Sequence, residues 1–520
     1  MRRTHVRTFA RIIAFVALGV DRTTDIPRGE ISEAAETLQN ARKAGKFNRQ
    51  LTPDDLYDYC AYARSTILLE AMNESKLVVI GGDAAGMSAA SKVRRSFPER
   101  EIVVFERGKH TSYAACGMPY FIGGDVDSAD RLVARSPEVI REKMKIDVRT
   151  LHEVTAIDTS AKQVTVHDLK HDQTLTESYD DLLIATGAEP SRPPIEGINA
   201  HGVRGLSSLQ SGIEALEEIS ARKPKTGVIV GGGYIGIEMA EALLARGMHV
   251  SLVDMAPQVM TTMDADMASL ISDYMSSQGV HVYLGEKLQR IETDRFGRAT
   301  AVFTDTQRLP ADIVFLGTGV KPNSSLAAEA GIETGARGAI AVNKKLQTSA
   351  PRVWAAGDCA ESYHLVSQEQ VFIALGTVAN KHGVVAGTNL SGGDVEFPGV
   401  LGTAITKMNE LEIARTGLSE AEAERLGRNF ESATIRSHTR AGYYPGGGDI
   451  TVKLLVDKDS GRVIGGQIVG APGSGKRIDT VATAITCRMR PSDMMNLDLS
   501  YAPPFSPVWD PVQVAARRFV

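Results

Sequence analysis

The sequence predicts an α/β fold with two domains built on parallel sheets and a smaller α+β domain at the C-terminus. Residues 76–96 read as an apolar strand, a glycine-rich turn and an alanine-rich helix, and the same order recurs at residues 225–246. Residues 440–470 alternate in the manner of a β-hairpin and precede one further helical pattern. The two strand-turn-helix units indicate two Rossmann-like domains, each suited to a dinucleotide.

The composition indicates a multidomain protein that acts on small molecules. The chain has 520 residues, of which 43% are hydrophobic, and a net charge of -5, so it lacks the basic field that nucleic acid or an anionic membrane requires. Its four cysteines lie far apart without a CxxC spacing: Cys60, Cys116, Cys359 and Cys487. This spacing argues against a zinc site or a secreted disulfide framework. We therefore expect a cytoplasmic protein with no metal site.

Residues 1–75 are expected to form a helical extension of unknown role. Apolar residues recur at helical spacing between residues 31 and 70, and Thr52 and Pro53 are typical of a helix start. Two arginines followed by the apolar run from Ile12 to Val20 imitate a secretory signal, which leaves export as an alternative. A second alternative is translation from Met72. The run is too short to span a bilayer.

The first unit, KLVVIGGDAAGMSAASKVRRS, carries the pattern of a dinucleotide turn. Gly81 permits the tight turn and Gly86 permits close packing of helix on strand, while the helix N-terminus faces the pyrophosphate. Glu106 ends the next strand and is placed to accept hydrogen bonds from a ribose diol. The middle glycine position holds Asp83, which is a departure from the pattern.

The second unit, KTGVIVGGGYIGIEMAEALLARGMHVSLVD, is a complete copy with Gly231, Gly233 and Gly236. Asp254 ends its second strand without an adjacent arginine. Because an acidic side chain bonds a 2'-hydroxyl and repels a 2'-phosphate, we expect NADH to be preferred over NADPH.

Three further apolar runs end in glycine, at residues 179–190, 311–323 and 351–361. Two of them bracket the second unit, so we expect the chain to leave the first domain, build the second and return. The predicted domains are residues 76–190 with 315–395, then 191–314, and finally 396–520. Asp358 leaves the third run in a position to bond the polyol of an extended cofactor.

From about residue 76 to the C-terminus, these motifs resemble the FAD-dependent pyridine nucleotide-disulfide oxidoreductases. The segment SYAACGMPYFIGG resembles their single-cysteine branch, which contains coenzyme A disulfide reductases, NADH oxidases and NADH peroxidases. The resemblance implies FAD at the first turn, NAD(P)H at the second and a homodimer formed by the C-terminal domain. The candidate cofactor-binding residues are Gly81, Gly82, Gly86, Glu106, Ser112, Val154, Thr186, Gly187, Asp358, Gly231, Gly233, Gly236, Glu238, Asp254 and Gly319.

The resemblance makes Cys116 the redox-active residue. No second cysteine lies four or five residues away, so the acceptor of the flavin electrons is a mixed disulfide or an oxidised sulfur. The thiolate is the active species, and we expect its pKa to fall beside a helix start or the flavin ring. Thr111 and Ser112 are candidates to cap such a helix.

Two features favour a coenzyme A disulfide as the acceptor. Peroxidases and water-forming oxidases of this branch place a histidine in the first glycine turn, where this chain has Ala84 and Ala85. In coenzyme A disulfide reductases, the counterparts of GYYPG and YAPP bring tyrosines to the cysteine of the other subunit. The candidate catalytic residues are therefore Cys116, Tyr443, Tyr444 and Tyr501.

The phosphates of coenzyme A require cations, and Arg94 and Arg95 at the far end of the first helix match the family's placement. Two departures weaken this substrate assignment: Asp83, and Ala115 where many coenzyme A disulfide reductases have asparagine. Three alternatives stay open. They are an NADH oxidase or peroxidase with a cysteine sulfenic acid, a persulfide or sulfur reductase, and a redox-sensing flavoprotein that binds a partner.

Overall fold

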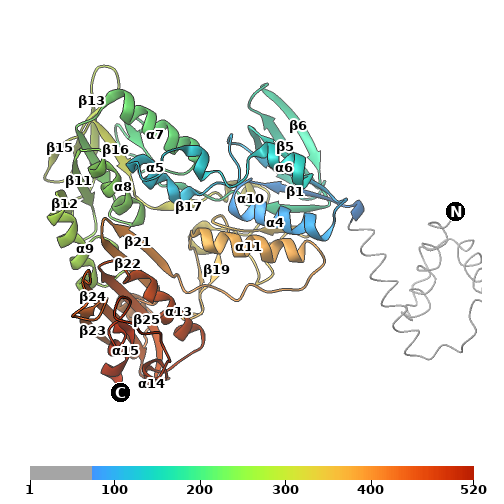
Figure 1. Ribbon diagram of the computed structural model, residues 1–520. Helices are drawn as coiled ribbons and strands as arrows, with labels where there is room; N and C mark the ends of the chain where they lie inside the picture. The colour runs from blue at the N-terminus through green and yellow to red at the C-terminus, as the bar shows by residue number, and fades with distance from the viewer. Residues whose placement is uncertain (1–72) are drawn as a thin grey trace, which may run out of the picture.

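The computed structural model describes residues 73–520, and Figure 1 shows its arrangement. The helices predicted between residues 31 and 70, the apolar run and Cys60 lie outside the described residues. The two domains built on parallel sheets lie side by side at the top of Figure 1, and the C-terminal domain lies below the second of them. Within the described residues, no helix is long and apolar enough to cross a membrane.

The first domain is built on a five-stranded parallel sheet, as predicted. Its strand order is β18-β7-β1-β2-β3, from Val353–Ala355, Asp181–Ile184, Lys76–Ile80, Glu101–Glu106 and Asp147–Thr150. Strand β18 pairs with β7, so the chain returns to this sheet after the second glycine turn. Helices α4 (Ala84–Ser96) and α11 (Gly376–Asn389) pack closely, because Gly383 and Gly387 leave room for the backbone of α4.

The second domain repeats this order with the sheet β12-β11-β10-β16-β9. The strands are Val280–Leu284, His249–Asp254, Thr226–Val230, Ile313–Leu316 and Val203–Arg204. Its helices are α7 (Leu209–Arg222), α8 (Tyr234–Ala245) and α9 (Ala265–Ser277). The predicted boundary between residues 314 and 315 is wrong, because it cuts β16, which pairs with β10 over its whole length.

Smaller sheets and helices complete the two domains. In the first domain they are β4 (His152–Asp158), β5 (Gln163–Asp168), β6 (Gln173–Ser178), α6 (Pro137–Met144) and α10 (Ser325–Glu329). The second has a three-stranded sheet of β13 (Arg290–Thr293), β14 (Ala299–Phe303) and β15 (Arg308–Pro310). The chain crosses between the domains at β8 (Ala188–Pro190) and β17 (Val320–Pro322), which pair with each other.

The C-terminal domain has one antiparallel sheet in the order β21-β22-β25-β24-β23. The strands are Ala404–Met408, Leu411–Gly417, Arg462–Gly470, Asp449–Asp457 and Phe430–His438. The predicted hairpin is confirmed as β24 and β25, and the helix predicted after it is confirmed as α13 (Ile478–Thr486). Helices α12 (Glu420–Arg425), α14 (Pro491–Met495) and α15 (Pro511–Ala516) complete the α+β domain.

Candidate active site

The first glycine turn connects β1 to α4 and is closely packed. Gly81 has a φ of +106°, and a Cβ there would lie 2.1 Å from the carbonyl oxygen of Ala185. A Cβ at Gly86 would lie 2.0 Å from the carbonyl oxygen of Gly81. Glu106 accepts hydrogen bonds from the Gly82 amide (2.8 Å) and the Gly108 amide (2.6 Å). The turn therefore admits only glycine at these positions, and Glu106 joins it to the end of β2.

The second turn has nearly the same geometry. Gly231 has a φ of +107°, and Asp254 accepts hydrogen bonds from the amides of Gly232 (2.6 Å) and Ala256 (2.8 Å). Gly233 is the N-cap of α8, and a Cβ there would meet no atom within 4 Å. This open space at a helix N-terminus allows a pyrophosphate to approach the backbone.

Asp358 follows β18 and brings an unpartnered carboxylate oxygen to the first turn. Its Oδ1 atom is buried and, among the described residues, has no hydrogen-bond partner. Burial raises the pKa of Asp358 to about 6. Since a buried carboxylate without a partner costs free energy, this oxygen is suited to accept a hydroxyl of a bound ligand. The adjacent Gly357 amide donates to Nδ1 of the buried His382 (3.3 Å).

The crossing between the domains uses three of the predicted cofactor residues. The Thr186 hydroxyl donates to the backbone carbonyl of Asn323 (2.6 Å), and the side-chain amide of Asn323 donates to the backbone carbonyl of Thr186 (2.9 Å). Gly187 and Gly319 have φ values of +68° and +83°. Val154 lies in β4 at an irregularity in its pairing with β5. Thr186, Gly187 and Gly319 therefore lie where the chain enters and leaves the crossing, whereas Val154 does not.

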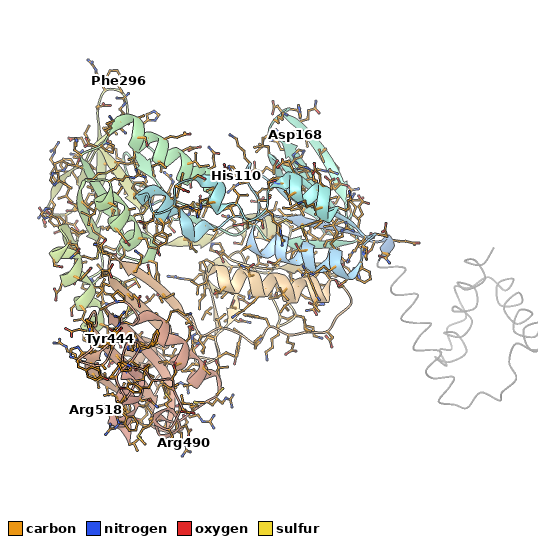
Figure 2. All side chains as sticks on the ribbon, in the orientation of Figure 1. His110, Asp168, Phe296, Tyr444, Arg490 and Arg518 are labelled. Atoms are coloured by element: carbon orange, nitrogen blue, oxygen red, sulfur yellow. The ribbon has the colours of Figure 1, made fainter. Side chains whose placement is uncertain are left out.

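Cys116 lies in a 3-10 turn, Ala115–Gly117, directly before α5 (Met118–Gly123). We call residues 110–117 the Cys116 segment. Figure 2 shows His110, its first residue, at the junction of the two domains built on parallel sheets. Cys116 is exposed, but partial burial raises the pKa of its thiol, and the charges of Glu238 and Asp358 raise it further. Burial and these carboxylates therefore oppose the fall in the thiol pKa expected beside a helix start, and the fall expected beside a flavin ring stays a prediction.

The proposed helix caps are wrong. The N-cap positions before Cys116 and α5 are Ala114 and Gly117, and neither Thr111 nor Ser112 caps a helix. Ser112 instead has a φ of +51°, and its amide donates to the carbonyl of Gly82 (3.0 Å). Its backbone thus joins the Cys116 segment to the first glycine turn.

Glu238, on α8, links the second turn to the C-terminal domain. It accepts a hydrogen bond from the Thr406 hydroxyl (2.8 Å), and burial raises its pKa. Close by, Lys407 pairs with Glu241 (2.6 Å) and lies over the ring of Tyr120 (5.5 Å). These contacts from β21 fasten α8 and α5 to the C-terminal domain.

The candidate tyrosines are on the surface of the C-terminal domain, where Figure 2 labels Tyr444. The exposed fractions of Tyr443, Tyr444 and Tyr501 are 77%, 38% and 45%. A hydrogen bond that the Tyr501 hydroxyl donates to Tyr443 raises the pKa of Tyr501. The structure therefore pairs Tyr443 with Tyr501.

Arg94 and Arg95 differ in what they contact. The Arg94 guanidinium donates to the carbonyls of Pro98 (2.6 Å) and Lys145 (2.7 Å), which holds the C-terminal end of α4. Arg95 is exposed. Of the two, Arg95 has the freer side chain for a phosphate.

Comparison with known proteins places this geometry in a family. Residues 75–383 match the family described as pyridine nucleotide-disulphide oxidoreductase, and residues 403–511 match its dimerisation domain. The chain is a pyridine nucleotide-disulphide oxidoreductase. It thus belongs to a class of FAD-dependent NAD(P)H oxidoreductases, as its motifs predicted.

Three relatives of this oxidoreductase illustrate the range of activities. The chain is 40% identical to an NAD(P)H coenzyme A polysulfide/persulfide reductase of Pyrococcus horikoshii, over 85% of this chain and 98% of that protein. It is 37% identical to an NADH oxidase of Methanocaldococcus jannaschii (85% and 98%). It is 30% identical to a coenzyme A disulfide reductase of Staphylococcus epidermidis (83% and 97%).

The fold of the oxidoreductase agrees with solved structures. An NAD-dependent persulfide reductase from A. fulgidus superposes with a TM-score of 0.82 at 40% identity, over 85% of this chain and 82% of that one. In this oxidoreductase, the residues at the first turn fit FAD. The turn accepts no side chain at Gly81 or Gly86, and the unpartnered oxygen of Asp358 is a ready acceptor for the ribityl hydroxyls.

Several contacts of the oxidoreductase site were missed by sequence reasoning. Thr406, Lys407 and Tyr120 surround Glu238 and Glu241, and the Asp83 carboxylate accepts a hydrogen bond from the Tyr113 amide (3.1 Å). Thr406 and Lys407 come from a domain more than 160 residues away in the chain, so no local pattern marks them. Asp83 was visible as a departure from the glycine pattern, but its partner was not.

Proposed function

We propose that this oxidoreductase uses NADH to reduce a disulfide or persulfide of coenzyme A, with Cys116 as its single redox-active sulfur. The observation that supports the proposal is that Cys116 is exposed, joined through Ser112 to the first glycine turn, and affected by the charge of Glu238 on the helix after the second turn. The other two described cysteines do not serve: Cys359 is buried beside β18, and Cys487 ends α13. A cytoplasmic location is proposed because the three described cysteines are free thiols and the proposed reaction consumes a disulfide.

The reaction needs one thiolate that is regenerated in each cycle. The Cys116 thiolate attacks one sulfur of coenzyme A disulfide, which forms a Cys116–coenzyme A mixed disulfide and releases one coenzyme A thiolate. Bound FAD supplies the two-electron transfer from NADH. Two electrons and one proton then return Cys116 to the thiolate and release the second coenzyme A as a thiol. The role of the chain is to hold Cys116 between both cofactor sites and to supply the protons.

Mass spectrometry of the nonreduced protein tests the proposal. We expect an adduct with the mass of coenzyme A on the peptide that contains Cys116, and its loss on treatment with a thiol or NADH. The peptide that contains Cys487 is the internal control in the same sample. Cys487 is also exposed, and we expect no adduct on it. An unmodified Cys116 after incubation with coenzyme A disulfide would contradict the proposal.

Tyr443 and Tyr501 are proposed to act across a homodimer formed by the matched dimerisation domain. A phenol with a pKa near 10 can protonate a departing coenzyme A thiolate. We expect Tyr501→Phe to lower kcat for coenzyme A disulfide by about 10²-fold, with a smaller effect of Tyr443→Phe, because Tyr443 acts through its bond to Tyr501. Steady-state kinetics with Tyr444→Phe as the control checks this. If all three variants kept the wild-type kcat, the tyrosines would have a role in packing alone.

NADH is proposed as the reductant because Asp254 stands at the end of β11 with its neighbour Met255 exposed, so no cation is supplied by that neighbour. A carboxylate there accepts the adenosine 2'-hydroxyl and repels a 2'-phosphate. Steady-state kinetics with NADH and with NADPH decide the preference.

Arg95, with Arg94 beside it, is proposed to bind the coenzyme A phosphates. Arg95→Ala should therefore raise KM for coenzyme A disulfide without lowering kcat.

A second candidate function, NADH oxidation through a Cys116 sulfenic acid, is favoured by the exposure of this sulfur. Ala84 and Ala85 supply no proton donor in the first turn for cleavage of an O–O bond. Oxygen and peroxide consumption, measured against turnover of coenzyme A disulfide, separates the two functions.

A further inference from the structure

We propose that Asp83 is a positioning residue whose carboxylate ties the Cys116 segment to the FAD turn, so that cofactor binding and the placement of Cys116 depend on one side chain. This inference rests on the assignment of FAD to the first turn. It concerns the N-cap position, where one glycine turn has Asp83 and the other has Gly233.

Comparison of the two turns shows what Asp83 adds. Asp83 is the N-cap of α4 and Gly233 is the N-cap of α8, so the two residues hold equivalent places. At Gly233 the space that a Cβ would enter is open to 4 Å. In the first turn the side chain of Asp83 stands in the corresponding space, where a phosphate group approaches the helix N-terminus.

The Asp83 carboxylate does not cap its own helix. It makes no side-chain cap bond, and its Oδ1 accepts from the amide of Tyr113 (3.1 Å), outside the helix. The preceding amide, from Ser112, donates to the carbonyl of Gly82 (3.0 Å). Two successive amides of the segment that leads to Cys116 are thus bonded to two successive residues of the turn. The left-handed φ of Ser112 (+51°) costs conformational energy, which these bonds offset.

The charges around Asp83 make this tether sensitive to an anionic ligand. Burial, together with the charges of Glu106 and Asp358, raises the pKa of Asp83 to about 6, although the amide bonds oppose the rise. Glu106 lies at the end of β2 and Asp358 follows β18, while Tyr113 and Cys116 face it from the Cys116 segment. A pyrophosphate beside Asp83 would raise its pKa again. FAD affinity should therefore fall as the pH rises through about 6, because the bound state holds the proton more tightly.

Two substitutions separate the tether from the charge. Asp83→Asn keeps an oxygen that accepts from the Tyr113 amide but removes the charge, whereas Asp83→Ala removes both. Asp125→Asn is the control, because Asp125 is an exposed aspartate beyond α5. Each variant is prepared without FAD and titrated with FAD between pH 5.5 and 8, with flavin fluorescence as the readout. The FAD-loaded proteins are then alkylated with iodoacetamide at Cys116.

We expect the FAD Kd of the wild type and Asp125→Asn to rise at least about 3-fold from pH 6 to 8. The Kd of Asp83→Asn should be lower and should rise by a smaller factor, because Asp358 is then the remaining carboxyl of the two that have a pKa of about 6. Alkylation of Cys116 should differ at least about 3-fold between Asp83→Asn and Asp83→Ala. Both variants remove the Asp83 charge that raises the thiol pKa, but only Asp83→Ala also frees the segment.

Equal alkylation of the two variants would overturn the tether. A Kd of Asp83→Asn that rises with pH as steeply as that of the wild type would overturn the proposed effect of the Asp83 charge. A wild type that binds no FAD would instead overturn the cofactor assignment, and alkylation of the unloaded variants would still test the tether.

Discussion

Replacing Cys116 with serine is expected to lower kcat for coenzyme A disulfide by at least about 10³-fold while FAD stays bound. A serine hydroxyl is not ionised near neutral pH, so it cannot attack a disulfide or leave as a thiolate does. The substitution exchanges one exposed side chain for another of similar size, so the fold should not change. NADH oxidation with coenzyme A disulfide measures the rate, and the flavin absorbance spectrum measures the bound cofactor.

The matched control is Cys487→Ser, since Cys487 is also exposed but ends α13 in the C-terminal domain. We expect it to retain the wild-type rate. If Cys116→Ser reduced coenzyme A disulfide as fast as the wild type, the single-sulfur mechanism would be wrong. Disulfide reduction absent in both the wild type and Cys116→Ser, with Cys116-dependent peroxide turnover, would instead favour the oxidase.

Gly81→Ala is expected to abolish FAD binding and to lower the melting temperature by at least about 5 °C. The alanine would have to adopt a φ of +106°, and its Cβ would lie 2.1 Å from the carbonyl oxygen of Ala185 at the end of β7. The conformational strain alone costs about 1–3 kcal/mol, and relief of the contact requires β1 and β7 to separate. Flavin content and thermal unfolding check both effects.

Gly247→Ala isolates the conformational part of this cost. Gly247 also has a left-handed φ (+75°), but a Cβ there would meet no atom within 4 Å. We expect this control to lose some stability and to keep its FAD. If both variants retained FAD and had the same melting temperature, the close contact at Gly81 would not contribute to FAD binding or to stability.

The sequence alone was sufficient for the parts that depend on local backbone geometry. A strand, a glycine turn and a helix leave a pattern within about 30 residues, so β1, α4, β10 and α8 were all predicted, as was the hairpin of β24 and β25. The discontinuous first domain was predicted from strand ends followed by glycine. The boundary inside β16 was not, because a strand and the turn that leaves it look alike in either domain.

The site was predicted less completely, because its contacts join residues far apart in the chain. The pattern singled out Cys116 but suggested that Ser112 caps a helix, whereas the fold turns its amide to Gly82. Arg94 was predicted to bind phosphate, and the tertiary structure directs it to the carbonyls of Pro98 and Lys145. The carboxylates of Glu238 and Asp358, more than 120 residues from Cys116, raise its thiol pKa.

By itself, the sequence determined which residue types carry the chemistry: glycines where a side chain cannot fit, acids at the ends of strands and one cysteine without a neighbour. Only the tertiary structure decided how the backbone and the distant charges surround that cysteine. The physical reason is that the glycine pattern reflects short-range steric limits within one turn, whereas hydrogen bonds and electrostatic fields depend on which distant segments the folded chain brings together.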